Sequence, residues 1–141
     1  MLFKRPDALL WEYVSPMCEG FAIKGSAGVR WRDNRKNTKP FSVSTDIVGA
    51  IIASQLIIWV SLDFERIEKE YALTVFESSP PILLLTPKRK DVAEVIKNLV
   101  IAFTVEGVAS SVTITEQQGG VTVIRFTNVR VNGLIPDEEF Q

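Results

Sequence analysis

A proline followed by strict alternation of residue types near the N-terminus constrains the fold of this chain most. Pro6 has no amide hydrogen and a fixed φ, so it ends the strand expected over residues 1–4. Beyond it, every second residue is large and apolar or aromatic, namely Leu9, Trp11 and Tyr13. Because successive side chains of a strand point to opposite faces, this period of two predicts a β-strand that presents these three residues on one face.

The rest of the chain is predicted to form mainly antiparallel hairpins. Short apolar or alternating segments are separated by glycine, proline and polar residues, a pattern typical of strands joined by turns. The expected strands cover residues 20–24, 29–32, 40–43, 71–77, 82–86, 97–104, 108–115 and 121–131, and the first of them carries Phe21 and Ile23 on one face. Helical turns are expected near residues 63–66 and 91–95. The 141 residues suffice for a single domain with a buried core.

Residues 46–60 are predicted to form a longer helix. Ser44 or Thr45 can cap its N-terminus, and Asp46 places an acid in its first turn. Apolar residues lie nearly all round it, so it must be enclosed, because an amphipathic surface helix has a polar face. It is shorter than the ~20 residues of a membrane span. Two interpretations stay open: a helix that permanently fills the core, or a lid that moves aside for a lipid.

The absence of histidine from the sequence excludes most catalytic and metal-binding arrangements. Ser-His-Asp and Cys-His nucleophiles, HExxH zinc sites and imidazole acid–base catalysis all need this residue. Acidic pairs such as Asp63 and Glu65 lie in polar surroundings, which do not raise a carboxyl pKa toward neutrality. The single cysteine, Cys18, excludes an internal disulfide and lies within the domain, unlike an acylated N-terminal anchor. We therefore predict a protein that is not an enzyme and uses no cofactor or metal.

The charge of the chain gives no sign of a nucleic-acid partner. Sixteen basic residues nearly balance 17 acidic ones, for a net charge of −1. A local basic cluster consists of Arg30, Arg32, Arg35, Lys36 and Lys39. Asp33 reduces the positive charge of this cluster, and no aromatic residues flank it at a spacing suited to base stacking. The segment is therefore predicted to be a solvated loop.

The pattern R-P-x-x-L-x-W-x-Y-x-x-P over residues 5–16 resembles the lipoprotein carrier family of the Gram-negative periplasm, the LolA/LolB type. Two later segments fit the same family in the same order. One is the strand–turn–strand of residues 20–34, which bears Trp31, and the other is the C-terminal half, where PILLLTPKR leads to VTITEQQGGVTVIRFTNVRVN. The resemblance covers nearly the whole chain. It implies a mainly β fold with α, in which a curved antiparallel sheet forms an open half-barrel and one to two helices cover its concave face.

The resemblance also implies a non-enzymatic carrier. Such a protein binds the acyl chains of a lipoprotein, or of a related lipid, in an apolar hollow for transport toward the outer membrane. The residues expected to bind lipid are Leu9, Trp11 and Tyr13 of the strand and Ile51, Ile52, Leu56 and Trp59 of the helix. For each of them an ordinary core position is the alternative.

Arg5 is the polar residue with an expected role. In the family, the arginine of the R-P motif holds the lid closed by donating hydrogen bonds to lid carbonyl groups, and Arg5 matches that position. The five N–H donors of a guanidinium suit the exposed carbonyl groups at a helix end. The alternative is a surface ion pair with Asp7 or Glu12, which would add little stability.

The chain departs from the family pattern at its start, where the secretory signal, the N-terminal helix and the first strands are not seen. Location in the periplasm is therefore implied by the resemblance alone. The resemblance further implies an inner-membrane donor and an outer-membrane acceptor as partners. The strand over residues 1–4 is expected to be an open sheet edge, where a second copy can pair to form a homodimer.

Two other functions remain open for the same fold. A lipid-sensing or regulatory domain would use the same hollow to signal to a protein partner. A protein-interaction module would instead have a filled core. Lipid extracted from the purified protein would separate a carrier or sensor from an interaction module.

Overall fold

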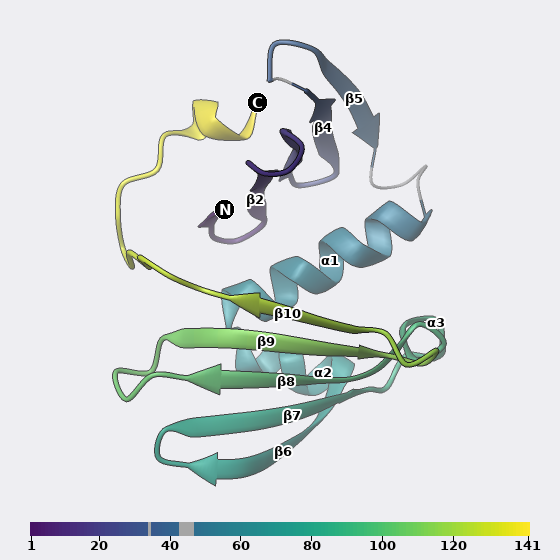
Figure 1. Cartoon of the computed structure of the whole chain (residues 1–141), viewed down its shortest axis with the longest axis vertical. Coiled ribbons are helices and arrows are strands. Elements are labelled where there is room, and N and C mark those ends of the chain that lie inside the picture. The colour runs from purple at the N-terminus through teal and green to yellow at the C-terminus, as the bar shows by residue number, and fades with distance from the viewer. Residues whose placement is uncertain (34, 43–46) are drawn as a thin grey trace. The chain divides into compact units, whose positions relative to one another are not determined.

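The strands of the chain form two antiparallel sheets (Figure 1). The computed structural model describes residues 1–33, 35–42 and 47–141, and it describes the side chains of the first helix from residue 54 onward. The chain divides into two units, Met1–Asp63 with Asn132–Gln141 and Phe64–Val131, each containing one five-stranded sheet. The predicted mainly β, antiparallel fold with helices is confirmed. The division of the strands into two ladders was not predicted.

In the first unit, each strand pairs with the next one along the chain. The strands are β1 Leu2–Lys4, β2 Ala8–Tyr13, β3 Glu19–Lys24, β4 Ala27–Arg32 and β5 Thr38–Ser42. Strand β2 confirms the strand predicted after Pro6. Gly25 has a φ of +64° in the short turn between β3 and β4, a conformation that glycine adopts without strain. This tight turn lets β4 begin at Ala27, two residues earlier than predicted.

Part of the basic cluster that was predicted to be a loop lies on paired strands. Strand β4 continues to Arg32, and β5 begins at Thr38 rather than at Pro40. In the ladder between them Arg30 lies opposite Lys39. Arg30 and Arg32 thus lie in the strand predicted over residues 29–32. The loop prediction was wrong for Thr38 and Lys39, because strand pairing uses backbone groups, which polar side chains on an exposed strand do not prevent.

The C-terminal segment packs on one face of the first sheet. Its 3₁₀ turn η1, Asp137–Phe140, buries Phe140. The core around Phe140 consists of Ala8, Leu10, Ala22 and Trp31, with Leu2, Val29 and Ile135 packed against it. Gly20 makes room for this arrangement, because a Cβ atom there would lie 2.6 Å from the Trp31 ring and 2.4 Å from the Trp11 carbonyl oxygen.

Ion pairs attach the C-terminal turn to the sheet. Asp137 lies 2.7 Å from the Lys4 ammonium nitrogen and 3.1 Å from that of Lys24. Hydrogen bonds from Lys4 and then from Lys24 lower the pKa of the Asp137 carboxyl. Arg35 donates a 2.7 Å hydrogen bond to the carbonyl oxygen of Glu139. The acidic C-terminal run is thus partly ion-paired.

Helix α1, Ile47–Ser61, corresponds to the helix predicted over residues 46–60. The predicted caps, Ser44 and Thr45, lie outside the described residues. The consecutive side chains at positions 56–59 are all buried. Consecutive helical residues point about 100° apart, so this part of α1 is enclosed on every side, as its all-round apolarity predicts. In the described part of the chain, no helix is long and apolar enough to cross a membrane.

The second unit combines a sheet of strand order β10-β9-β8-β7-β6 with two short helices. Its elements are α2 Phe64–Glu70, β6 Tyr71–Ser78, β7 Pro81–Pro87, α3 Lys90–Ala93, β8 Ile96–Phe103, β9 Ala109–Glu116 and β10 Val121–Arg125. One face of the sheet is apolar, and its buried residues include Leu83, Leu85, Leu99, Ile101 and Val112. These residues alternate with more exposed ones, in agreement with the period of two in the sequence.

Strand β10 ends at Arg125, although a strand was predicted as far as residue 131. Asn128 has a φ of +54°, in the left-handed region, and a strand does not continue through that conformation. Val129 and Val131 beyond it are exposed. Their alternation in the sequence therefore does not reflect a buried face.

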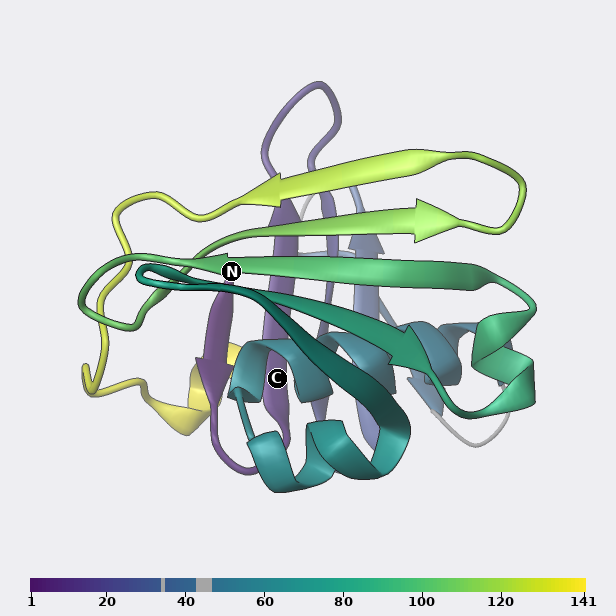
Figure 2. The ribbon, with the colours of Figure 1, turned by 90° about the horizontal axis from the view of Figure 1, so that it is seen from below.

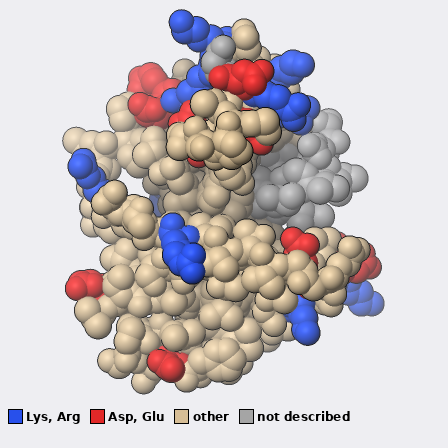
Figure 3. All heavy atoms as spheres, in the orientation of Figure 1, with Lys and Arg blue, Asp and Glu red and all other residues tan. Residues whose placement is uncertain are grey.

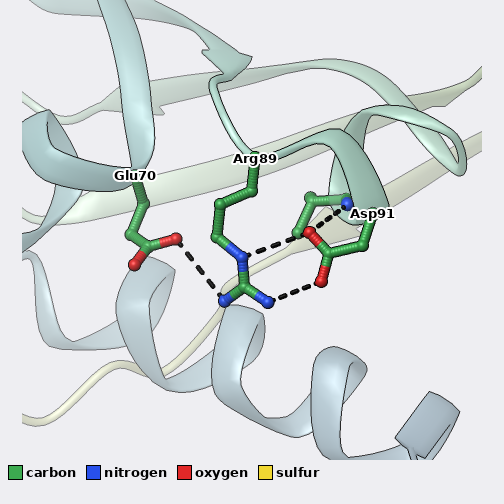
Figure 4. Close-up of polar contacts among 4 residues, drawn as sticks. Glu70, Arg89 and Asp91 are labelled. Carbon is green, nitrogen blue, oxygen red and sulfur yellow. Dashed lines mark hydrogen bonds and ion pairs between the residues drawn. The ribbon is translucent and has the colours of Figure 1, made fainter.

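Arg89 connects helices α2 and α3 of the second unit (Figure 4). Its Nη2 lies 2.5 Å from Asp91 Oδ2 in α3, and its Nη1 lies 3.7 Å from Glu70 Oε2 at the end of α2. The hydrogen bond from Arg89 lowers the pKa of the Asp91 carboxyl. Asp91 Oδ1 also accepts a 3.0 Å hydrogen bond from the Val92 amide. This cluster fixes α3 beside the start of β6.

Candidate binding face and helix anchor

Strand β2 presents the three predicted residues on one side. The rings of Trp11 and Tyr13 are 6.2 Å apart between centroids and tilted by 59°, so both lie on the same face. Exposure increases steadily along this face of the strand. Leu9 is fully buried, Trp11 is half-buried and Tyr13 is 52% exposed. The period of two thus identified the face correctly, whereas Tyr13 lies at its rim and not in its interior.

Neighbouring strands extend this face with further apolar residues. Leu9 lies opposite Phe3 of β1 and Ile23 of β3, and Trp11 lies opposite Phe21. We call the six residues Phe3, Leu9, Trp11, Phe21, Ile23 and Phe41 the apolar face. Ile23 is 1% exposed.

Phe41 of β5 belongs to the apolar face because of a glycine opposite it. Gly28 pairs with Phe41 in the β4–β5 ladder and with Ile23 in the β3–β4 ladder. A Cβ atom at Gly28 would lie 2.6 Å from the Phe41 ring, so the ring packs over the glycine. The sequence analysis did not assign Phe3 or Phe41 to this face, because their membership depends on strand register.

Helix α1 lies on the side of the apolar face. Figures 1 and 2 show it running across the sheet of the first unit, on the side opposite to the C-terminal turn. The C-terminal turn packs on the Leu10 side of the sheet, and α1 therefore lies on the Leu9 side. Among the helix residues predicted to face a hollow, Leu56 and Trp59 are 8% and 5% exposed. The side chains of Ile51 and Ile52 lie outside the described part of the structure.

Arg5 contacts the C-terminal end of α1. Its Nη2 donates a 2.9 Å hydrogen bond to the carbonyl oxygen of Ser61, the last residue of the helix. The last carbonyl groups of a helix have no partner within it and form the negative end of its dipole. No basic residue of α1 itself lies in its last turn, so the Arg5 guanidinium supplies a positive charge there. In the described residues Arg5 forms no ion pair with Asp7 or Glu12.

Three carboxyl groups have a clearly shifted pKa, and the direction of the shift does not suit acid–base chemistry. The carboxyl pKa values with a resolved shift, those of Asp91, Glu106 and Asp137, are all lowered, mainly by hydrogen bonds to the ionised form. A lowered pKa keeps a carboxylate ionised at neutral pH and makes it a poor general acid or base. Within the described residues no group of three or more potential ligands could hold a metal ion.

Comparison with known protein families identifies a family that matches the whole given sequence. The family described as outer membrane lipoprotein carrier protein LolA matches residues 1–141. The match therefore covers both units. A comparison with curated proteins gives no match.

Proposed function

Because the chain belongs to the LolA family of outer-membrane lipoprotein carriers, a periplasmic and non-enzymatic family, we propose that it carries lipid on its apolar face. The cargo is an acylated lipoprotein or a related lipid, and its acyl chains replace α1 on that face. The observation that carries the proposal is a row of fully buried apolar strand residues, Leu9 and Ile23, on the side of the sheet where an all-round apolar helix lies.

The energetics of an acyl chain suit such a site. Each CH₂ group removed from water contributes about 0.8 kcal/mol, so a lipid with several chains needs a shield to cross an aqueous compartment. The six side chains of the apolar face offer this shield without directed chemistry. Leu9 and Ile23 are buried in the present structure, and in this proposal cargo reaches them when α1 moves away.

In this proposal Arg5 is the latch of the closed state. Its hydrogen bond to Ser61 joins the turn between β1 and β2 to the end of α1. Breaking this hydrogen bond weakens the attachment of the C-terminal end of the helix to the sheet. Its formation after release of the cargo favours the empty, closed protein and so helps to expel lipid.

The family match also supports the site of action and the partners. We propose that the protein works in the periplasm, receives cargo from an inner-membrane donor and passes it to an outer-membrane acceptor. Nucleic acid has no place in this scheme. The charge of −1 gives no general attraction to a polyanion.

Lipid analysis of the purified full-length chain tests the proposal. We expect mass spectrometry of an organic extract to detect acylated lipid, and the delipidated protein to bind added diacyl lipid in a saturable manner. A protein that carries no lipid and binds none would have a filled core. That result would replace the carrier with a protein-interaction module.

A further inference from the structure

A single row of side chains crosses four strands of the first sheet. Trp11 of β2 lies opposite Phe21 of β3, Phe21 lies opposite Arg30 of β4, and Arg30 lies opposite Lys39 of β5. Directly opposed residues point to the same face of a sheet, so all four belong to the side that carries the apolar face. We call these four residues the boundary row.

The boundary row separates an apolar region from a polar one. On one side of it lie the buried Leu9 and Ile23. On the other side lie the exposed Tyr13 and an ion pair between Glu19 and Arg32, at 3.5 Å. Along the strands the face therefore changes from apolar, through aromatic and cationic, to polar. Aromatic and basic residues at such a boundary are typical of surfaces that contact the headgroup region of a lipid.

The two cations of the boundary row differ from the other arginines of the cluster. Arg32 pairs with Glu19, and Arg35 pairs with Glu139. Arg30 and Lys39 are both exposed, and in the described part of the chain neither forms an ion pair. Like charges directly opposite each other in a sheet destabilise it, so this pair carries a cost that a bound anion would remove.

We propose that Arg30 and Lys39 bind the phosphate of a phosphoglycerolipid whose acyl chains occupy the apolar face. The inference rests on the proposed function, since it takes the apolar face as the acyl site and adds the class of headgroup. An arginine fork matches phosphate oxygens with two parallel hydrogen bonds, and the lysine adds a compact positive charge. Trp11 and Phe21 lie in the same row as these cations, and the buried Leu9 and Ile23 form the next row along the strands. The whole boundary row therefore lies at the level of the glycerol backbone.

The test measures binding of water-dispersible lipids with identical short chains to the full-length protein. The probes are dioctanoyl phosphatidylglycerol and dioctanoylglycerol, with inorganic phosphate and polyglutamate as competitors. We expect the phosphatidylglycerol to bind about tenfold more tightly than the diacylglycerol at low ionic strength, and salt to reduce this preference. We expect inorganic phosphate to leave the bound lipid in place, because it gains nothing from the apolar face.

A double variant identifies the residues. Arg30→Gln with Lys39→Gln should abolish the preference and leave diacylglycerol binding unchanged. The matched control, Lys97→Gln with Arg130→Gln, removes two exposed charges from the second unit and should keep the preference. Denaturant unfolding should show the double variant to be at least as stable as the parent, because it loses a like-charge pair.

Each other outcome has a distinct meaning. Equal binding of both lipids by all proteins would overturn the headgroup site and leave the proposed function intact, whereas failure of both lipids to bind would refute the proposed function. If the double variant still prefers phosphatidylglycerol over diacylglycerol, the phosphate binds elsewhere on the protein. Displacement by inorganic phosphate would make free phosphate the ligand, and displacement by polyglutamate would indicate an acidic protein partner; both results would overturn the lipid site.

Discussion

Replacement of Arg5 by leucine tests the contact that holds α1 against the first sheet. The variant removes the guanidinium that donates to the Ser61 carbonyl at 2.9 Å and leaves the backbone of the turn unchanged. It also removes a positive charge from the negative end of the helix. If Arg5 is the latch, α1 should open more often while the rest of the sheet keeps its stability.

The structure sets the size of the effect. A hydrogen bond with a charged donor contributes roughly 1.5–3 kcal/mol. Arg5 is exposed and, among the described residues, makes one such bond, although its acceptor residue, Ser61, is buried. We therefore take the lower end, about 1.5 kcal/mol, which corresponds to an increase of about tenfold in the open fraction of α1.

Amide hydrogen exchange measures this opening directly. The backbone amides in the C-terminal half of α1 should exchange about tenfold faster in Arg5→Leu, since exchange through local opening follows the open population. An apolar dye should also bind more strongly, and lipid should be released more slowly because the closed state competes less well. The control Arg130→Leu removes an exposed arginine outside the strands and helices and should change none of these quantities.

If amide exchange in α1, dye binding and stability are all unchanged in the variant, the latch hypothesis is refuted. Arg5 would then be an ordinary surface charge. Faster exchange across the whole protein would mean global destabilisation. A denaturant titration separates that case from local opening, because a local change leaves the global free energy of unfolding within about 0.5 kcal/mol of the parent value.

Three further predictions concern packing, pH and self-association. Gly20→Ala should lower the free energy of unfolding by about 1–3 kcal/mol in a denaturant titration, because its Cβ would overlap an indole ring and a carbonyl oxygen, whereas Gly133→Ala, with open space around it, should change little. The pKa of Asp137 is lowered from its ordinary value of 3.8, so its ion pairs stabilise the C-terminal turn above that pH and are lost as the pH falls below it. Acid should therefore detach the turn from the sheet, and tryptophan fluorescence can monitor this change. Asp137→Asn should abolish this pH-dependent change. Strand β1 is a sheet edge, so a second copy should pair with it, and sedimentation should show a concentration-dependent dimer that Phe3→Pro disrupts; a monomer at all concentrations would contradict this.

Local sequence patterns predicted the helices and strands themselves better than they predicted which strands pair with each other. The alternation around Trp11 and the all-round apolarity of residues 46–60 depend on neighbouring residues, and both led to the correct element. Strand pairing depends on residues far apart in the sequence, so the two ladders and the opposition of Arg30 and Lys39 could not be predicted. A short-range pattern also cannot show where a strand ends when one residue, such as Asn128, takes a left-handed conformation.

In the candidate site, too, local features could be predicted from the sequence, whereas contacts between distant residues could not. Periodicity assigned Leu9, Trp11 and Tyr13 to one face but did not show how deeply each is buried. The contact of Arg5 with Ser61 joins residues 56 positions apart, and only the family resemblance indicated it. The packing of the C-terminal turn on the first sheet spans more than 100 residues, and no sequence pattern signalled it.

The central claim is that acyl chains occupy the apolar face beneath α1, and photo-crosslinking tests it most directly. A diacyl lipid with a photoreactive group in one chain is bound to the full-length protein, irradiated, and mapped by peptide mass spectrometry. The account predicts saturable labelling of β2, β3 and α1, centred on Leu9, Trp11 and Trp59. Labelling confined to exposed apolar residues of the second unit, such as Val75 and Phe76, would contradict it.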